Sequence, residues 1–291
     1  MLLQEKIEHT DFSPSERIVI DFIMEKQEFI ENYTTTAIAK ETYTSPSILI
    51  RIAKKLGFSG YNAFKKAFLE EVLYLKHNFH DLDANLPFSS RHSIMDIAAI
   101  ITNLKQESLR DTLSLIDPGQ LQKAVRLLKN AQAIKVFAIS NINYLAEEFV
   151  FKLRHIGIKA ETYLTSTTLF QEAKMSQPNE CAICISYSGE TPELNYTAKL
   201  LKKNRVPIIA ITSVGENSLT RLASVVLQTT TREKSYSKIG AFTSLESISA
   251  LLDILYSCLF QADYKNNYNY KIQLSKATEF RSIDNAIIQE D

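Results

Sequence analysis

Short apolar runs alternate with helical patterns along the second half of the chain, from Ala133 onward. The runs are rich in Ile, Val and Leu, as expected for strands buried on both faces of a parallel sheet. They cover residues 134–139, 158–164, 181–185, 207–211 and 225–227. Helical patterns cover residues 144–155, a stretch from about Thr167, and residues 192–203 and 243–260. Five strands separated by helices predict an α/β domain with a doubly wound, five-stranded parallel sheet.

The first 77 residues carry helical patterns only. Ser13-Pro14-Ser15-Glu16 has the form of a capping box and predicts the start of a first long helix. A short helix over residues 37–42 is followed by Ser45-Pro46, an N-cap with proline at the first helical position. The next helix has Ile48, Leu49, Ile52 and Leu56 at helical spacing and ends at Gly57, before another helix over residues 61–75. Two short helices joined by a tight turn predict an all-α helix-turn-helix domain.

These patterns divide the chain into four parts. We expect a helix-turn-helix domain over residues 1–77, a linker over 78–100, an α/β domain over 101–265 and a C-terminal tail over 266–291. The linker is placed where periodicity is lost around Pro87-Phe88-Ser89-Ser90, and a helix leading into the second domain is expected to start near Ser93. No function is assigned to the tail.

A turn rich in hydroxyl groups, Ser186-Tyr187-Ser188-Gly189-Glu190-Thr191-Pro192, separates the third strand from its helix. Gly189 permits a tight turn, Thr191 can act as the N-cap, and Pro192 fits the first helical position. Free backbone N–H groups and the positive end of the helix dipole would face a crevice there, with the Ser and Thr hydroxyls as additional donors. The turn therefore predicts a phosphate site, although Ser and Thr also cap ordinary helices.

The charge of the whole chain is balanced, with 33 basic and 33 acidic residues, so DNA binding would require a local patch. From Ser45 to Phe68 every charged residue is basic, namely Arg51, Lys54, Lys55, Lys65 and Lys66. A solvated helix face is the alternative interpretation of this cluster. If it is a DNA-binding patch, we expect modest non-specific affinity, with specificity from a dimer on two half-sites.

The sequence also bears on compartment and cofactors. The start, MLLQEKIEHTD, has no secretory signal, and no uninterrupted apolar run approaches the roughly 18 residues of a membrane span, which favours a cytoplasmic protein. Cys181 and Cys184 have the spacing of a redox or zinc pair, but strand positions three apart point to opposite faces. With Cys258 in an apolar helical stretch, core packing is favoured, and we predict no metal and no cofactor.

Three stretches together resemble the RpiR family of bacterial sugar-responsive transcriptional regulators: SPSERIVIDFIMEKQEFI, TTTAIAKETYTSPSILIRIAKKLGFSGYNAFKKAF and SYSGET. Members of this family join an N-terminal helix-turn-helix domain to a C-terminal sugar isomerase (SIS) domain. The pattern S-x-S-G-E-T resembles the SIS signature, in which this turn holds the phosphate of a phosphosugar. The resemblance covers about residues 10–260, and R-x-x-K-K-L-G-F is its most distinctive N-terminal motif.

The resemblance implies two sets of site residues and a homodimer or homotetramer. For a phosphorylated sugar effector it implies the hydroxyls of Ser186, Ser188 and Thr191 and the amides of Gly189 and Glu190, with Ser140 and Asn141 as substitute donors after the first strand. For a double-stranded DNA operator it implies Ser45, Ser47, Arg51 and Lys54 on the recognition helix, with Lys55, Lys65 and Lys66 at phosphates.

The chain departs from the family at two places. Threonine is frequent in the family where this chain has Ile48, so one polar reader is lost or the side chain is turned inward. A glycine-rich loop ending in serine is common after the first strand, but Ala138 and Ser140 replace the glycines and Ile142 replaces the serine. The ligand or its pose is therefore expected to differ from the family norm.

The resulting interpretation is a DNA-binding regulator of carbohydrate metabolism whose SIS domain binds a phosphosugar and modulates operator binding. One alternative is a constitutive DNA-binding dimer whose degenerate SIS domain binds nothing. A second alternative is a phosphosugar isomerase, but its candidate bases, Glu190, Glu246 and His155, have no tuning partner that the sequence identifies. We therefore expect no catalytic residues.

Overall fold

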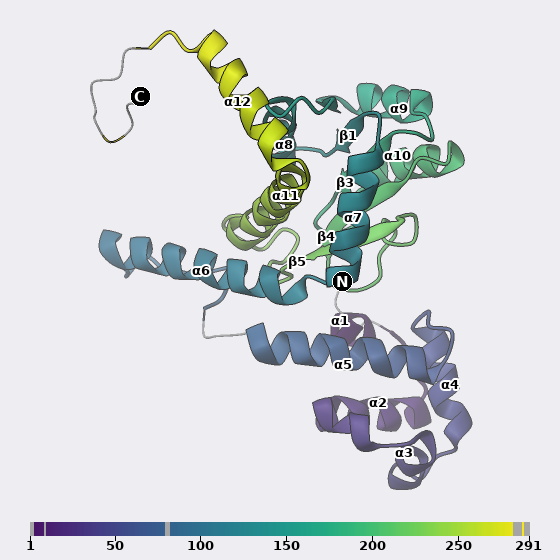
Figure 1. The fold of residues 1–291 in the computed structure, drawn as a ribbon. Coiled ribbons are helices and arrows are strands. Elements are labelled where there is room, and N and C mark those ends of the chain that lie inside the picture. Colours follow the sequence, from purple (N-terminus) through teal and green to yellow (C-terminus); the bar gives the residue numbers. More distant parts are fainter. Residues whose placement is uncertain (1–2, 9, 79–81, 282–286, 288–291) are drawn as a thin grey trace.

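The computed structural model describes residues 3–8, 10–78, 82–281 and 287. A helical domain precedes an α/β domain, and a further helix follows at the C-terminal end (Figure 1). The helical domain consists of α1 (Leu3–Glu8), α2 (Pro14–Lys26), the 3-10 helix η1 (Gln27–Asn32), α3 (Thr35–Glu41), α4 (Pro46–Lys55) and α5 (Tyr61–Asn78). The all-α character predicted for this part of the chain is confirmed, whereas α1 and η1 were not anticipated.

The predicted helix starts have the expected chemistry. The backbone N–H of Ser13 donates to the Glu16 carboxylate at 2.9 Å, and Pro14 occupies the first position of α2. In α4, Ile48, Leu49 and Ile52 are buried against the core that also contains Phe64 and Phe68 of α5. Each of these side chains contributes about 1.5–3 kcal/mol by leaving water. The apolar spacing of α4 therefore fixes which of its faces remains exposed.

The α/β domain contains five parallel strands in the order β2-β1-β3-β4-β5. The strands are β1 (Ile134–Phe137), β2 (Ala160–Thr162), β3 (Cys181–Ile185), β4 (Ile208–Ser213) and β5 (Val225–Thr229). The helices are α6 (Ile94–Leu115), α7 (Pro118–Asn130), α8 (Ile142–Arg154), α9 (Ser166–Met175), α10 (Pro192–Lys203) and α11 (Phe242–Ala262). The predicted doubly wound parallel sheet is confirmed, and α6 begins directly after Ser93, as expected.

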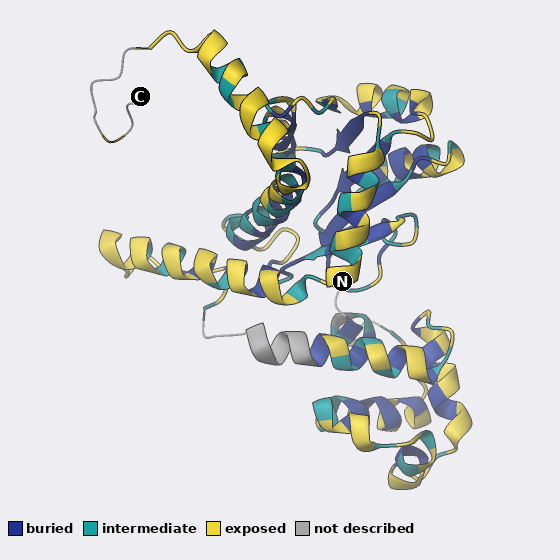
Figure 2. Cartoon of the chain, viewed as in Figure 1, coloured by how far each residue is buried: buried dark blue, intermediate teal, exposed yellow. Residues whose placement is uncertain are grey.

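Helices cover both faces of the sheet. Residues of α7, α8 and α11 share one hydrophobic core with the sheet, and residues of α9 and α10 form the other (Figure 2). Cys181 lies in the first core and Cys184 in the second, so the two thiols point to opposite faces as predicted. Burial raises the pKa of Cys181 to about 12 and also raises that of Cys184. Both thiols are core residues.

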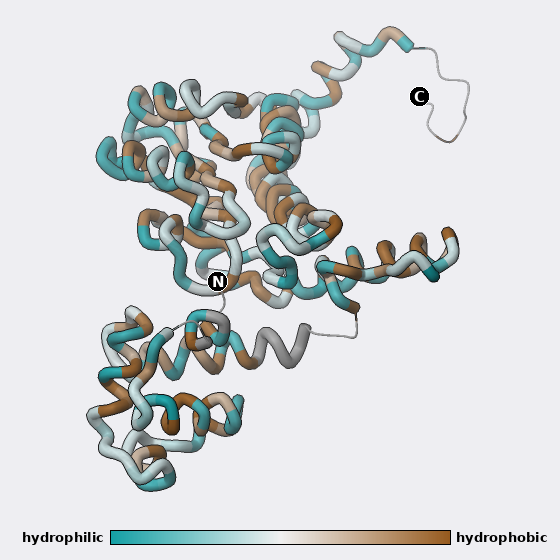
Figure 3. The backbone as a smooth tube through the Cα atoms, turned by 180° about the vertical axis from the view of Figure 1, so that it is seen from behind, coloured by the Kyte–Doolittle hydropathy of each residue, from teal (hydrophilic) through white to brown (hydrophobic). Residues whose placement is uncertain are grey.

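The long helix α11 is among the most hydrophobic parts of the molecule (Figure 3). Its length and composition would suffice to cross a membrane, but it packs against α6, α8 and β5 and buries Ile248, Leu251 and Leu255. It therefore acts as a core helix. After it comes α12 (Tyr264–Thr278), which has no buried residue and for which the sequence analysis proposed no structure.

Candidate functional site

The turn that follows β3 is held in a conformation that requires glycine. Gly189 has a φ of +67°, and a Cβ atom there would lie 2.1 Å from the side chain of Asn217. The Asn217 amide in turn donates to the hydroxyl of Thr212 at the end of β4, at 3.1 Å. Because no side chain fits at this position, the tight turn that was predicted at Gly189 is imposed by packing as well as by backbone geometry.

The hydroxyl groups of this turn form hydrogen bonds with one another and with its backbone amides. Ser186 Oγ lies 2.8 Å from Thr191 Oγ1 and accepts the Gly189 amide at 3.1 Å, while Ser188 Oγ accepts the Glu190 amide at 3.2 Å. Thr191 is the N-cap of α10, although its side chain makes no capping bond. The oxygens of a bound phosphate could replace these internal acceptors, because helix N-termini and free amides stabilise anions.

The strand order places this turn beside the loop that follows β1. Strands β1 and β3 are neighbours, and β2 lies on the other side of β1, so the chain reverses its direction across the sheet between β1 and β3. Ligands of doubly wound sheets bind in the crevice outside the carboxyl ends of the strands at such a reversal. Both predicted sets of effector residues therefore belong to the edge where this architecture forms its binding crevice.

The loop after β1 keeps a glycine-like path without glycine. Ser140 is exposed and has a φ of +62°, a conformation that costs a non-glycine residue about 1 kcal/mol or more. Asn141 is exposed at the N-cap of α8 and its side chain makes no capping bond. Ile142, which replaces the hydroxyl residue, packs against the hydrophobic core. Ser140 and Asn141 are thus the polar groups that this loop offers at the crevice.

The Glu190 carboxylate, next to the turn, is bound on its far side. Both oxygens of Glu190 accept hydrogen bonds from Ser218, one from its amide at 2.8 Å and one from its hydroxyl at 2.6 Å. This turns the carboxylate toward the loop after β4. Glu190 can therefore offer its backbone amide to an anion while its carboxylate is bound elsewhere.

Sequence reasoning missed the role of Tyr187, which connects the turn to the segment after β5. Its hydroxyl donates to the Glu233 carbonyl and accepts the Glu233 amide, each at 2.9 Å. The Nζ of Lys238 lies 5.0 Å from the centre of the Tyr187 ring and donates to Glu233 at 3.0 Å. The bond between Tyr187 and Glu233 joins positions 46 residues apart and therefore leaves no local pattern in the sequence.

The Glu233 carboxylate caps the N-terminus of α11. It accepts the amides of Thr243 and Ser244 at 2.6 and 3.1 Å and both of their hydroxyls at 2.8 and 2.6 Å. Burial alone would raise the pKa of Glu233, but the hydrogen bonds from Ser244 and Lys238 outweigh it and lower the pKa. Glu233 is therefore ionised and satisfies this helix N-terminus internally.

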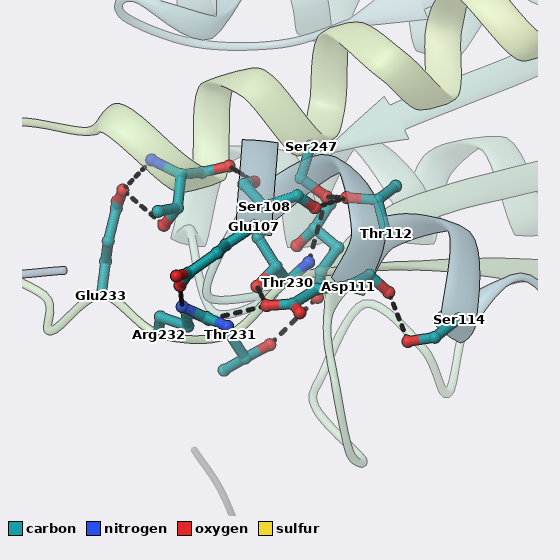
Figure 4. A network of polar contacts seen from close by, with 12 residues as sticks. Glu107, Ser108, Asp111, Thr112, Ser114, Thr230, Thr231, Arg232, Glu233 and Ser247 are labelled. Carbon is teal, nitrogen blue, oxygen red and sulfur yellow. Dashed lines mark hydrogen bonds and ion pairs between the residues drawn. The ribbon is translucent and has the colours of Figure 1, made fainter. Parts of the chain in front are cut away.

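A buried ionic cluster holds the same segment against α6 (Figure 4). The guanidinium of Arg232 pairs with Glu107 at 2.7 Å and with Asp111 at 2.6 Å. Thr112 of α6 donates to Ser247 of α11 at 2.7 Å, and the Ser247 hydroxyl accepts the Thr230 amide at 3.0 Å. The segment after β5 is thus fixed to both α6 and α11.

The exposed face of α4 carries the polar residues predicted for DNA recognition. Ser47, Arg51 and Lys54 are exposed and follow one another at three- and four-residue spacing, which places them on one side of the helix. Ser45 is exposed at the N-cap, and its hydroxyl lies 2.8 Å from that of Ser47. This is the arrangement of a recognition helix that presents its N-terminal part to base edges.

The three lysines predicted to contact DNA phosphates have partners within the protein. Lys55 pairs with the buried Glu16 at 2.7 Å, and Lys65 donates to the carbonyls of Glu31 and Tyr33 at 2.8 and 2.9 Å. Lys66 lies 3.8 Å from Glu70 on the surface. The structure therefore separates Arg51 and Lys54, which face solvent, from Lys55 and Lys65, which also connect parts of the domain.

Two exposed residues on this surface were missed from the sequence. Tyr43, in the turn between α3 and α4, is 97% exposed and has a φ of +53°, and Ile50 of α4 is 48% exposed beside Arg51. Both residues are uncharged, so the cluster of basic residues that marked this surface in the sequence did not include them. Ile48, by contrast, is 7% exposed and packs inward, which decides between the two alternatives that the sequence left open.

Comparison with known families matches the helical domain and the α/β domain separately. Residues 1–73 match the family described as "Helix-turn-helix domain, rpiR family", and residues 127–257 match the "SIS domain" family. The chain is an RpiR-type helix-turn-helix regulator with a SIS domain. An uncharacterised HTH-type transcriptional regulator of Caldanaerobacter subterraneus subsp. tengcongensis is 23% identical to this regulator over 276 residues, 95% of this chain and 96% of the relative.

Solved structures support the fold of the whole chain in one case and of its second domain in another. The NanR protein of Vibrio vulnificus, complexed with ManNAc-6P, matches this regulator with a TM-score of 0.61 and 24% identity over 94% of this chain and 96% of its own. The sugar isomerase domain of an RpiR transcription factor from Sphaerobacter thermophilus matches with a TM-score of 0.56 and 18% identity, over 62% of this chain and 98% of its own.

Proposed function

We propose that this regulator binds operator DNA through α4 and senses a phosphorylated sugar at the turn after β3. Operator binding would require paired helical domains, so the active form is a homodimer or homotetramer in the cytoplasm that acts on genes of carbohydrate metabolism. The observation that carries the proposal is the turn from Ser186 to Thr191, whose hydroxyls and amides gather at a helix N-terminus on the edge where this fold forms its ligand crevice. The NanR relative, complexed with ManNAc-6P, supports a phosphosugar as the effector class.

The proposed effector residues are Ser186, Ser188, Gly189, Glu190 and Thr191, with Ser140 and Asn141 from the neighbouring loop. The phosphate would be held by hydroxyls and amides alone, since the Glu190 carboxylate is bound by Ser218. Sugar hydroxyls would then be left to Ser140 and Asn141, both exposed on the adjoining loop. Differential affinity for two arrangements of the dimer would convert this binding into a change in operator affinity.

Binding of the effector is tested by calorimetry with a panel of sugar phosphates that includes N-acetylmannosamine 6-phosphate. Ser188→Ala should weaken binding about tenfold, as expected for one hydrogen bond to a charged group. Ser257→Ala, an exposed hydroxyl on α11, is the matched control and should change nothing. No measurable binding of any compound by the wild type would favour the constitutive alternative, in which the SIS domain binds no effector, and equal measurable affinities of the two proteins would exclude Ser188 from the site.

Operator binding is tested by an electrophoretic shift on the DNA upstream of this chain's own gene, with and without the same compounds. Arg51→Ala should abolish the sequence-specific shift, because Arg is the commonest reader of guanine in the major groove. Absence of a sequence-specific shift for the wild type under any condition would refute the regulatory proposal.

We propose no catalytic role, because the three candidate bases are engaged away from the turn. Glu190 is bound by Ser218, Glu246 pairs with Lys105 at 2.8 Å, and the Nδ1 of His155 lies 2.8 Å from the Phe151 carbonyl. A general base must reach the carbon-bound proton of the substrate. Turnover of a hexose phosphate that disappears in Glu246→Gln would contradict this.

A further inference from the structure

The segment Arg232–Ile239, here called the coupling segment, lies between the effector turn and the chain that leads from the helical domain. On one side, both backbone polar groups of Glu233 bond to the hydroxyl of Tyr187. On the other side, the backbone groups next to Glu233 bond to Asn85: the Arg232 carbonyl accepts from Asn85 Nδ2 at 3.2 Å, and the Lys234 amide donates to Asn85 Oδ1 at 2.7 Å. The three consecutive residues from Arg232 to Lys234 thus connect Tyr187 to Asn85.

Asn85 is firmly held in this position. The Ile239 amide donates to its carbonyl at 3.1 Å, so the coupling segment contacts Asn85 at both of its ends. Asn85 and the preceding Ala84 are 9% and 3% exposed. The amide of Asn85 also donates to Asp83 at 2.8 Å, which closes a local turn. A buried carboxamide whose oxygen and nitrogen are both bonded fixes its surroundings in one arrangement.

Tyr187 connects the coupling segment directly to the proposed phosphate site. Tyr187 stands between Ser186 and Ser188, the two serines of the proposed phosphate site, and its carbonyl accepts the Ser213 amide at 2.9 Å. If phosphate oxygens replace the internal bonds of Ser186 and Ser188, the backbone on both sides of Tyr187 must readjust. The phenol is then the group that carries this change to Glu233.

We propose that the coupling segment transmits effector binding to the interdomain connection by holding or releasing Asn85, an inference that rests on the function proposed above. The length of chain released with Asn85 makes the change in reach between the two domains large. From Asn78, the last residue of α5, a fully extended chain reaches at most about 25 Å to Asn85 but about 55 Å to Ile94, the start of α6. The difference of about 30 Å is comparable with the 34–36 Å that separates two half-sites one helical turn apart.

Retention of Asn85 therefore restricts the separations that two paired helical domains can reach, and its release widens them. The other anchors of the coupling segment remain in place in both states. Arg232 stays paired with Glu107 and Asp111 of α6, and Glu233 stays on the N-terminus of α11. The bonds that involve Tyr187 and Asn85 change, together with the packing of the buried Ala84 and Pro87 beside Asn85, while the anchors on α6 and α11 stay in place.

The test uses Tyr187→Phe, which removes the hydroxyl and keeps the ring, in the full-length protein without ligand or DNA. Hydrogen–deuterium exchange is measured at single-amide resolution. We expect the amides of Lys234 and Ile239, which bond to Asn85 and not to Tyr187, to exchange about tenfold faster, as the loss of a hydrogen bond predicts. Reciprocally, Asn85→Ala should accelerate exchange at Gly189 and Glu190 in the turn.

Tyr236→Phe is the matched control, because Tyr236 lies in the same segment and is 93% exposed. It should leave all of these amides unchanged. Unchanged exchange at Lys234 and Ile239 in Tyr187→Phe, or equal acceleration in both variants, would overturn the coupling. Since this measurement needs no effector, its outcome is independent of whether the protein senses a sugar phosphate.

A second measurement follows the affinity for DNA with two half-sites during titration with N-acetylmannosamine 6-phosphate. If the wild type responds, Asn85→Ala should still bind this compound, with an affinity shifted by the lost coupling, and lose most of the DNA response. A retained response in Asn85→Ala would overturn the coupling while the phosphosugar-sensing function stands. A wild type that binds no compound of the calorimetric panel would refute the sensing function, and the exchange result would still decide whether the segment couples the two sites.

Discussion

Two adjacent lysines at the end of α4 have opposite surroundings, so replacing each with alanine separates DNA binding from stability. Lys54 is exposed, and its side chain contacts no polar partner among the residues that the structure describes. Lys55 is 42% exposed and pairs at 2.7 Å with Glu16, whose side chain is 5% exposed. Lys54→Ala should therefore weaken DNA binding alone, whereas Lys55→Ala should destabilise the helical domain.

The size of the Lys55 effect follows from the pKa of Glu16. The hydrogen bond from Lys55, followed by that from the Ser13 amide, lowers the pKa of Glu16 from 4.5 to about 2. At 1.36 kcal/mol per pKa unit this is about 3 kcal/mol in favour of the charged folded form. Because Ser13 contributes and Lys55 is screened by solvent, we assign about 1–2 kcal/mol to Lys55.

The sign of the pH dependence is fixed by the same shift. A carboxyl group whose folded pKa is lowered stabilises the protein fully above its unfolded pKa, near 4.5, and loses that contribution as the pH falls through 2. The difference in stability between the wild type and Lys55→Ala should therefore be complete at pH 7 and shrink between pH 4.5 and 2.

Native-state hydrogen exchange of the slowest amides in α2 and α4 measures this stability at pH 7. Exchange in Lys55→Ala should be about 5–30 times faster, and exchange in Lys54→Ala unchanged. On a duplex, Lys54→Ala should reduce the slope of log affinity against log salt by about 0.9, the value for one lost phosphate contact. Equal exchange rates in the two variants, or a Lys55→Ala protein as stable as the wild type, would refute this reasoning.

Other substitutions test the site and the core. Gly189→Ala places a Cβ atom 2.1 Å from Asn217 and should abolish sugar phosphate binding in calorimetry while DNA binding is retained; unaltered binding would disprove the tight turn. Arg232→Met leaves Asp111 without its cation and should cost about 3–5 kcal/mol in urea unfolding. Since burial raises the pKa of Asp111, this cost should fall as the pH is lowered. Ile48→Thr should cost about 1–3 kcal/mol, whereas an outward-facing side chain would cost nothing.

The fold was predictable because its signals are local. The five apolar runs, the capping box at Ser13 and the proline at the start of α10 each specify an element within a few residues. Helix α12 was not predicted, because its Asn- and Tyr-rich sequence lacks an apolar face and none of its residues is buried in the described structure. Patterns of burial cannot reveal a helix that buries nothing within its own chain.

The candidate site was only half predictable. Ser186, Ser188 and Thr191 are marked by their position between a strand and a helix. This signal lies within the six residues 186–191. The contacts of Tyr187 and Asn85 join positions 46 and 147 residues apart and involve backbone groups of Glu233 and Arg232, which have no side-chain signature. The predicted DNA contacts at Lys55 and Lys65 show the same limit, since sequence gives their charge but not their internal partners.

The loop after β1 bears on whether the crevice can still hold a ligand. A degenerate loop would be free to relax to an ordinary backbone conformation, yet Ser140 has a positive φ of +62°, a conformation that favours glycine. Strain of this kind persists only where the surroundings impose it. The neighbouring Ala138 is fully buried and Ile142 packs against the core, so both replacements place apolar side chains at the base of the loop. The loop thus keeps its path with Ser140 and Asn141 exposed, which favours a site of altered specificity over an empty one.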